Sequence, residues 1–189
     1  MDIAGQLFTL VAVVVGAAAS FTATALSERS RARRETARAW EQRKYDQLAT
    51  YAADVKVVSI IARQLAAGFD LEERAPGSLV PAEGRQLLAD AEIRRSISME
   101  RLRLLADIET LGAANRLNEA VWDLTWVARG LVSGVTREQW RGAIEQFSKA
   151  FDAFHAMARK ELEVPGRHAA RVIGPMPNSE TLGSPSTAA

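Results

Sequence analysis

Residues 136–158 read TREQWRGAIEQFSKAFDAFHAMA, and this stretch decides the fold class of the chain. Its apolar side chains recur at steps of four and three residues, which places them on one face of an α-helix. They are Trp140, Ile144, Phe147, Phe151, Phe154 and Ala158. Thr136 and Gln139 form a capping box, in which each side chain satisfies a backbone amide at the helix start. The stretch therefore predicts an amphipathic helix that begins near Thr136 and ends before Pro165 and Gly166.

Three earlier segments predict further helices. The first extends to Gly68, with a helical face made of Leu48, Tyr51, Val55, Val58, Ala62 and Leu65. The second begins near Pro81, because proline is tolerated in a first turn, and its apolar positions are Leu87, Leu88, Ala91, Ile97, Leu102, Leu105 and Ile108. After a break between Asp107 and Gly112, capped by Asp107 or Thr110, the third carries Ala114, Leu117, Val121, Leu124, Ala128 and Leu131. Short connections between such helices favour an all-α fold, an antiparallel bundle of about four helices.

An uncharged segment near the N-terminus, IAGQLFTLVAVVVGAAASFTATAL, occupies residues 3–26. At about 1.5 Å per residue this segment spans about 36 Å as a helix, enough to cross a hydrocarbon core of about 30 Å. Basic residues follow it directly: Arg29, Arg31, Arg33, Arg34, Arg38, Arg43 and Lys44. The positive-inside rule places this flank in the cytoplasm. The sequence therefore predicts a single-pass transmembrane helix, with the N-terminus outside and the rest of the chain cytoplasmic.

A cleaved signal peptide is the alternative, since small residues such as Ala23 and Ala25 could form a cleavage site. It would make the mature protein a secreted helical protein. Against it, Asp2 is the only charged side chain before the apolar segment, where a signal peptide carries basic residues. The retained anchor is the favoured interpretation.

Small side chains recur every four residues along the predicted anchor, at Ala12, Gly16, Ser20 and Thr24. A stripe of this kind lets two helices approach closely in lipid and so predicts self-association. It also arises by chance in a segment this rich in small residues.

The predicted domains are a transmembrane helix at 3–26, a cytoplasmic helical domain at 27–163 and a disordered tail at 164–189. The tail is rich in Pro, Ser, Thr, Gly and Ala, and it lacks the apolar content that offsets ordering entropy. The chain has 24 basic and 23 acidic residues and no cysteine. Disulfides, thiolate metal sites and cysteine nucleophiles are thereby excluded.

Two segments, LSERSRARRETARAWEQRKYDQLATYAADVK at 26–56 and EAVWDLTWVARG at 119–130, carry a family resemblance. Their pattern resembles a group of uncharacterised single-pass membrane proteins from high-GC Gram-positive bacteria, over most of 26–162. The resemblance implies a membrane-tethered helical domain and implies no activity or site residues.

Several residues are candidates for a functional site. Asp152 and His155 are three apart, as ligands of di-iron bundles are, but a second such pair is missing and a boundary histidine is the simpler interpretation. Trp122 and Trp126 could form an aromatic platform, although packing in or on the bundle is the ordinary role of such residues. Glu72 and Glu73, beside Arg74, indicate a solvated charged loop. Ser27, Ser96, Ser98 and Ser133 have no histidine partner, and no phosphate-binding loop occurs.

The basic residues between Arg29 and Lys44 could contact nucleic acid, but their position beside the apolar segment explains them as a topology signal that attracts anionic headgroups. We therefore predict no catalytic, cofactor-binding or metal-binding residues, no cofactor and no nucleic-acid partner. The expected function is a membrane-anchored structural or interaction module without enzymatic activity, whose contacts are the lipid bilayer, an unidentified protein or a second copy of the chain. A ligand-sensing or enzymatic bundle with an unrecognised site is the alternative.

Overall fold

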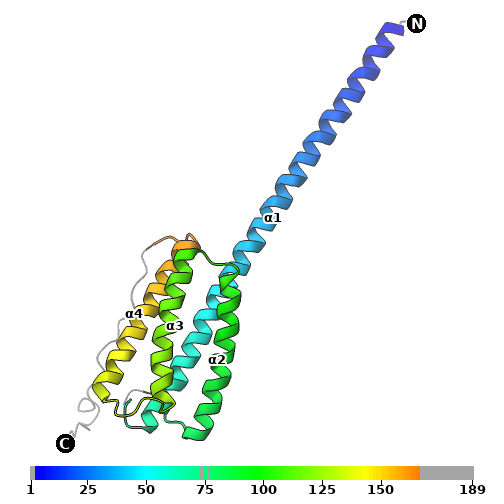
Figure 1. The fold of residues 1–189 in the computed structure, drawn as a ribbon. Helices are drawn as coiled ribbons and strands as arrows, with labels where there is room; N and C mark the ends of the chain where they lie inside the picture. The colour runs from blue at the N-terminus through cyan, green and yellow to red at the C-terminus, as the bar shows by residue number, and fades with distance from the viewer. Residues whose placement is uncertain (1–2, 73–74, 76, 167–189) are drawn as a thin grey trace, which may run out of the picture.

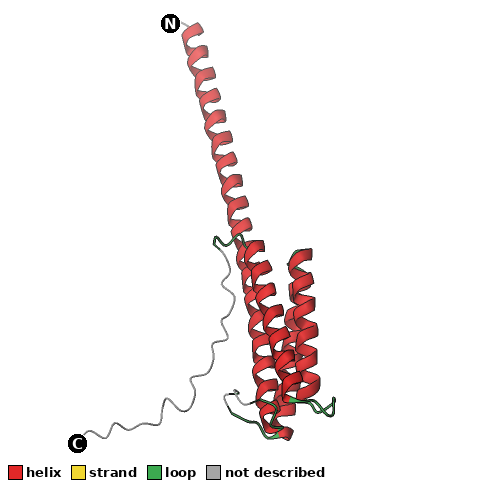
Figure 2. Ribbon diagram, turned by 90° about the vertical axis from the view of Figure 1, so that its left-hand side faces the viewer, coloured by secondary structure: helices red, strands yellow, loops and turns green. Residues whose placement is uncertain are grey.

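The structure is a computed structural model that describes residues 3–72, 75 and 77–166, with the backbone alone described at 3–27 and at 30. Within these residues the chain is all α-helical: α1 (Ile3–Gly68), α2 (Pro81–Arg103), α3 (Ile108–Ala128) and α4 (Arg137–Glu161). The four helices form a bundle from which the N-terminal part of α1 projects (Figures 1 and 2). The predicted all-α class and the order of the four helices are confirmed.

The predicted membrane span forms the N-terminal part of α1. Residues 3–26 belong to α1, but their side chains lie outside the described residues. Among the residues that are described, no helix is both long and apolar enough to cross a membrane. The predicted tail lies outside the described residues from 167 onward.

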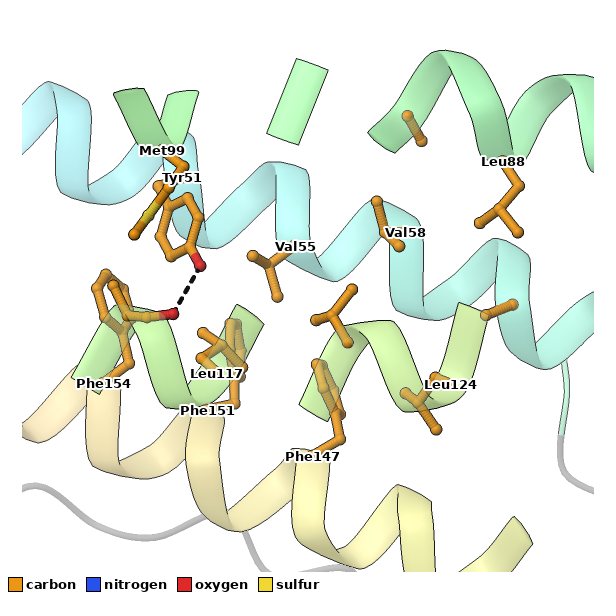
Figure 3. Packing of buried hydrophobic residues seen from close by; sticks show 14 of the residues in the cluster. Tyr51, Val55, Val58, Leu88, Met99, Leu117, Leu124, Phe147, Phe151 and Phe154 are labelled. Carbon is orange, nitrogen blue, oxygen red and sulfur yellow. Dashed lines mark hydrogen bonds between the residues drawn. The ribbon is translucent and has the colours of Figure 1, made fainter. Parts of the chain in front are cut away.

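Neighbouring helices in sequence run antiparallel, so α1 and α3 run in the same direction (Figure 1). Close backbone approaches join α1 to α2, α1 to α3 and α3 to α4, whereas α2 meets α3 over a shorter stretch. Small buried residues on α3, Ala113 and Ala114, leave room for α1. The Tyr51 hydroxyl of α1 donates a hydrogen bond to the Ala114 carbonyl of α3 at 3.1 Å (Figure 3). The parallel pair α1 and α3 therefore forms the centre of the bundle.

The core is built from the predicted faces of α1, α3 and α4. Figure 3 shows Val55 and Val58 of α1 in one apolar cluster with Leu117 of α3 and Phe151 of α4. Tyr51 and Phe154 meet edge to face, with 5.3 Å between ring centroids. Burying each large apolar side chain contributes about 1.5–3 kcal/mol, so α4 is held mainly by its aromatic stripe.

The predicted face of α2 is partly wrong. Leu88, Ala91 and Leu102 are buried as expected, but Ile97 is 49% exposed and Leu87 is exposed as well. Ile108, predicted to belong to this helix, is the exposed first residue of α3. Arg95, only 5% exposed, and Ser98 occupy the buried face in their place. The reason is close packing on α1: at Gly84 an added Cβ would lie 2.4 Å from Leu65 Cδ2, so α2 is positioned by small residues and not by its isoleucines.

The first residues of α2, α3 and α4 are set by capping side chains or by a proline in the first turn. Thr136 and Gln139 form the predicted capping box of α4. Asp107 is the N-cap of α3, and its Oδ1 accepts the Thr110 N–H at 2.7 Å. Pro81 is the first residue of α2. Leu131, predicted to belong to α3, lies beyond its end at Ala128 and is exposed, since Gly130 with φ 72° ends the helical path there.

Candidate functional site

The candidate metal pair does not form a ligand cluster. His155 packs its ring against Phe151, with 4.5 Å between ring centroids, at the edge of the aromatic stripe. Within the described residues, no three His, Asp or Glu side chains gather closely enough to hold a metal ion. The structure thus gives His155 a packing contact at the core boundary.

The two tryptophans of α3, Trp122 and Trp126, are both exposed. They lie on the side of the helix opposite its buried residues, which include Leu117 and Leu124. They therefore belong to the bundle surface, the second of the two packing roles expected for them.

Glu72 is not part of a solvated loop, so this prediction was wrong. Its side chain is only 8% exposed, and its Oε2 pairs with Arg63 Nε at 3.0 Å. The same oxygen accepts the Trp140 indole N–H at 3.2 Å. Glu72 thereby ties the end of α1 to the first turn of α4. Two such partners offset the cost of burying this carboxylate, and residue type alone does not reveal them.

Of the serines, Ser98 is buried and bonds the Arg95 carbonyl at 3.0 Å, as helix serines often do. Residues 31–43 of the basic segment are all exposed, and they belong to the part of α1 that projects from the bundle, with Trp40 and Glu41 at its base. This segment thus forms a bare helical stalk, with Arg31 and Glu35 paired across one turn at 3.0 Å. That the segment has no nucleic-acid partner stays a prediction.

A cleft of about 500 Å³ lies at the end of the bundle where the stalk begins. We call it the end cleft. Its lining comes from three elements: Trp40, Glu41 and Lys44 of α1; Leu104 and Leu105 of the α2–α3 connection; and Glu161, Leu162 and Glu163 at the end of α4. The connection and the end of α4 lie at the same end of the bundle, beside α1 (Figure 1). The end cleft therefore exists only when α1, α2 and α4 are packed together.

Glu161 organises the end cleft. Its side chain is 3% exposed, and its Oε1 pairs with Lys44 Nζ at 3.0 Å. The same Oε1 accepts the backbone N–H of Asp107 at 3.0 Å. Its Oε2 is buried and has no hydrogen-bond partner among the described residues. The Glu161 carboxylate thus joins the end of α4 to α1 and to the N-cap of α3. Its second oxygen accepts no hydrogen bond from the described residues.

Sequence reasoning missed Glu161, although a signal for it existed. An acidic side chain in the last turn lies at the negative end of the helix dipole, where a carboxylate is disfavoured. Glu161 is the last residue of α4, after Arg159 and Lys160. An unfavourable charge at that place indicates a compensating partner, which the structure identifies as Lys44.

The electrostatics around the end cleft follow from local hydrogen bonds. The backbone N–H of Thr110 holds the pKa of Asp107 below its usual range, with a small further contribution from Lys44. On the neighbouring surface the Glu109 carboxylate raises the pKa of Lys160. The Lys160–Glu109 ion pair joins the start of α3 to the end of α4.

Deeper in the bundle, Arg95 forms a second unusual feature. Its Nε is buried without a hydrogen-bond partner, and no carboxylate among the described residues pairs with it. Burial lowers the pKa of Arg95, and burial raises the pKa of Tyr51 to about 12 against the opposing charge of Arg95. A phenol that stays neutral beside a buried guanidinium offers no nucleophile or general base at neutral pH.

Comparison of the chain with models of protein families, with curated proteins and with solved structures found no match.

Proposed function

We propose that the protein is a membrane-anchored interaction module, a single-pass protein whose helical bundle lies in the cytoplasm and has no catalytic activity. The observation that carries the proposal is that α1 is one unbroken helix, Ile3–Gly68, shared between the bundle and the projecting N-terminal segment. The uncharged sequence at 3–26 supports an anchor there, and the basic residues after it support a cytoplasmic bundle. The end cleft supports a binding role for the bundle.

The anchor is tested by two measurements on the full chain. A cytoplasmic reporter fused after Leu162 should be active, and the protein should stay in the membrane fraction after an alkaline carbonate wash. Recovery of a shortened, soluble product outside the cell would overturn the proposal in favour of a cleaved signal peptide.

We also propose that the anchor contributes to self-association through the stripe of Ala12, Gly16, Ser20 and Thr24. The support is the sequence spacing alone, because small side chains four residues apart let helix backbones approach in lipid. In a transmembrane association assay, Gly16→Ile should weaken the signal, and Val14→Ile, off the stripe, should not. Equal signals from both variants and the wild type would leave the anchor as a tether only.

A further inference from the structure

We propose that the end cleft binds a basic peptide segment of a partner protein, with an Arg or Lys side chain held by Glu161 and an aliphatic side chain placed along α2. The proposal names the partner chemistry of the interaction module and rests on that role, but it does not depend on the membrane anchor.

The charge of the end cleft selects for a cation. Its lining carries three carboxylates, Glu41, Glu161 and Glu163, and one ammonium, Lys44. Lys44 already pairs with Glu161, so it does not neutralise the other two acids. An Arg or Lys from a partner would complement the two acids that remain, Glu41 and Glu163, beside the paired Glu161.

On this proposal the cation binds the second carboxylate oxygen of Glu161, Oε2. Oε1 is occupied by Lys44 and by the Asp107 N–H, but Oε2 has no donor among the described residues although it is buried. A buried acceptor without a donor costs about 1–3 kcal/mol, which a donor that reaches it would recover. A guanidinium or ammonium group is the donor that this carboxylate favours most.

Exposed apolar side chains beside the acids favour a peptide over a free amine. Leu104 is 83% exposed and Trp40 is 52% exposed. Leu104 also lines a second hollow of about 450 Å³, together with Ser96, Ile97, Glu100 and Arg101 on α2. The two hollows therefore share Leu104 and continue along the outer face of α2, an elongated surface that suits an extended chain.

The spacing of the two hollows predicts a motif. From Ile97 to Leu104, α2 rises about 10 Å at about 1.5 Å per residue. An extended peptide covers this distance in about three residues at about 3.3 Å each. A segment that runs along α2 would thus place its basic residue in the end cleft and an aliphatic residue about three positions away, near Ile97.

The test uses the full chain in detergent and fluorescein-labelled peptides. The probe is Ala-Arg-Ser-Ser-Leu-Ala, and its matched controls replace Arg by Glu or Leu by Ser. Fluorescence anisotropy should detect binding of the probe, at least tenfold weaker binding of the Leu-to-Ser peptide, and no binding of the Glu peptide. Equal affinities for the Arg and Glu peptides would overturn the proposal.

Variants of the protein locate the contact. Glu161→Gln should weaken binding of the probe at least tenfold, and Leu104→Ser about fivefold. Glu138→Gln, in the first turn of α4 at the far end of the bundle, is the matched control and should leave binding unchanged. Because Leu104 is exposed, Leu104→Ser keeps the test valid even if Glu161→Gln fails to fold. Unchanged binding in Leu104→Ser would overturn the proposed placement.

The chain's own C-terminal sequence is the competing occupant, since Arg167 and Arg171 follow the end of α4. A peptide of residues 167–177 and a chain truncated after Gly166 test it. If the truncated chain binds that peptide with the same dependence on Glu161 and more tightly than the probe, the partner proposal is overturned. Neither result depends on the reporter and carbonate experiments, so failure of the anchor and failure of this site are distinguishable.

Discussion

Helices α2 and α4 have similar lengths, 23 and 25 residues, but they bury different kinds of side chain. In α4 the buried face consists of Trp140 and three phenylalanines, with Ala158 at its end. In α2 it includes Gly84, Ala91 and Arg95, while Ile93 and Ile97 face outward. The periodicity of large apolar residues identifies a packed face when those residues make the contact, as in α4. It misplaces part of the face when small and polar residues share the contact with large ones, as in α2, where Leu88, Met99 and Leu102 are buried beside Gly84 and Arg95.

The strongest test of this difference is a matched pair of substitutions to aspartate. Phe151→Asp in α4 should lower the free energy of unfolding by about 4 kcal/mol, because it places an unpaired charge in the core. Ile97→Asp in α2 should change it by less than about 0.5 kcal/mol, since the side chain is half exposed. Urea titration followed by tryptophan fluorescence measures both values. Similar losses from the two variants would show that the outer face of α2 is covered.

Arg95 provides the next test. Its guanidinium is buried with no carboxylate partner among the described residues, so removing the charge relieves a desolvation cost. We expect Arg95→Met, which keeps a long side chain, to raise the free energy of unfolding by about 1–2 kcal/mol. The same titration measures it, with the exposed Arg94→Met as control. A loss of stability in Arg95→Met alone would mean that the guanidinium has a stabilising partner.

Two glycines should respond to alanine with opposite signs. A Cβ at Gly84 in α2 would lie 2.4 Å from Leu65 Cδ2 and 2.9 Å from its Cγ, whereas one at Gly142 in α4 meets nothing within 4 Å. Gly142→Ala should stabilise by about 1 kcal/mol through helix propensity. Gly84→Ala should destabilise by about 1 kcal/mol, because overpacking outweighs the same gain. Thermal melts of the two variants check this, and a rise in both would show that α2 is packed less closely on α1 than described.

The smallest expected effect concerns Asp107, the N-cap of α3, whose backbone N–H bonds Glu161 at the end of α4. The Thr110 N–H holds the pKa of Asp107 below its usual range, so the charged carboxylate stabilises the folded chain above the unfolded pKa of about 3.9. Asp107→Asn keeps the cap but loses the charge, and it should cost about 0.5 kcal/mol at pH 7 for this mostly exposed group. The difference from wild type should shrink as pH falls below about 4. A difference that is constant from pH 7 to pH 3 would contradict this origin.

The all-α fold, the order of the helices and their caps followed from periodicity and local chemistry, which act within a few residues. Tyr51, Val55 and Phe151 were placed correctly because large apolar residues at helical spacing made the contacts. Glu72, Arg95 and Glu161 were not, because their burial depends on partners distant in sequence: Glu72 reaches Trp140, and Glu161 reaches Lys44. The end cleft was missed for the same reason, since its lining comes from α1, the α2–α3 connection and the end of α4, which only tertiary packing brings together.

With residues 3–26 in the membrane, as proposed, the stalk of α1 determines where the end cleft lies relative to the bilayer. Trp40 lies about 21 Å beyond Leu26 at about 1.5 Å per residue, so α1 sets the height of the end cleft above the bilayer. Because α1 contains both the proposed anchor and one wall of the end cleft, it also fixes the direction, within the membrane plane, in which the cleft opens. Seven residues inserted into the stalk would raise the cleft by about 10 Å and turn it by only about 20°. Five inserted residues would turn it by about 140°, toward a different set of neighbours in the membrane plane.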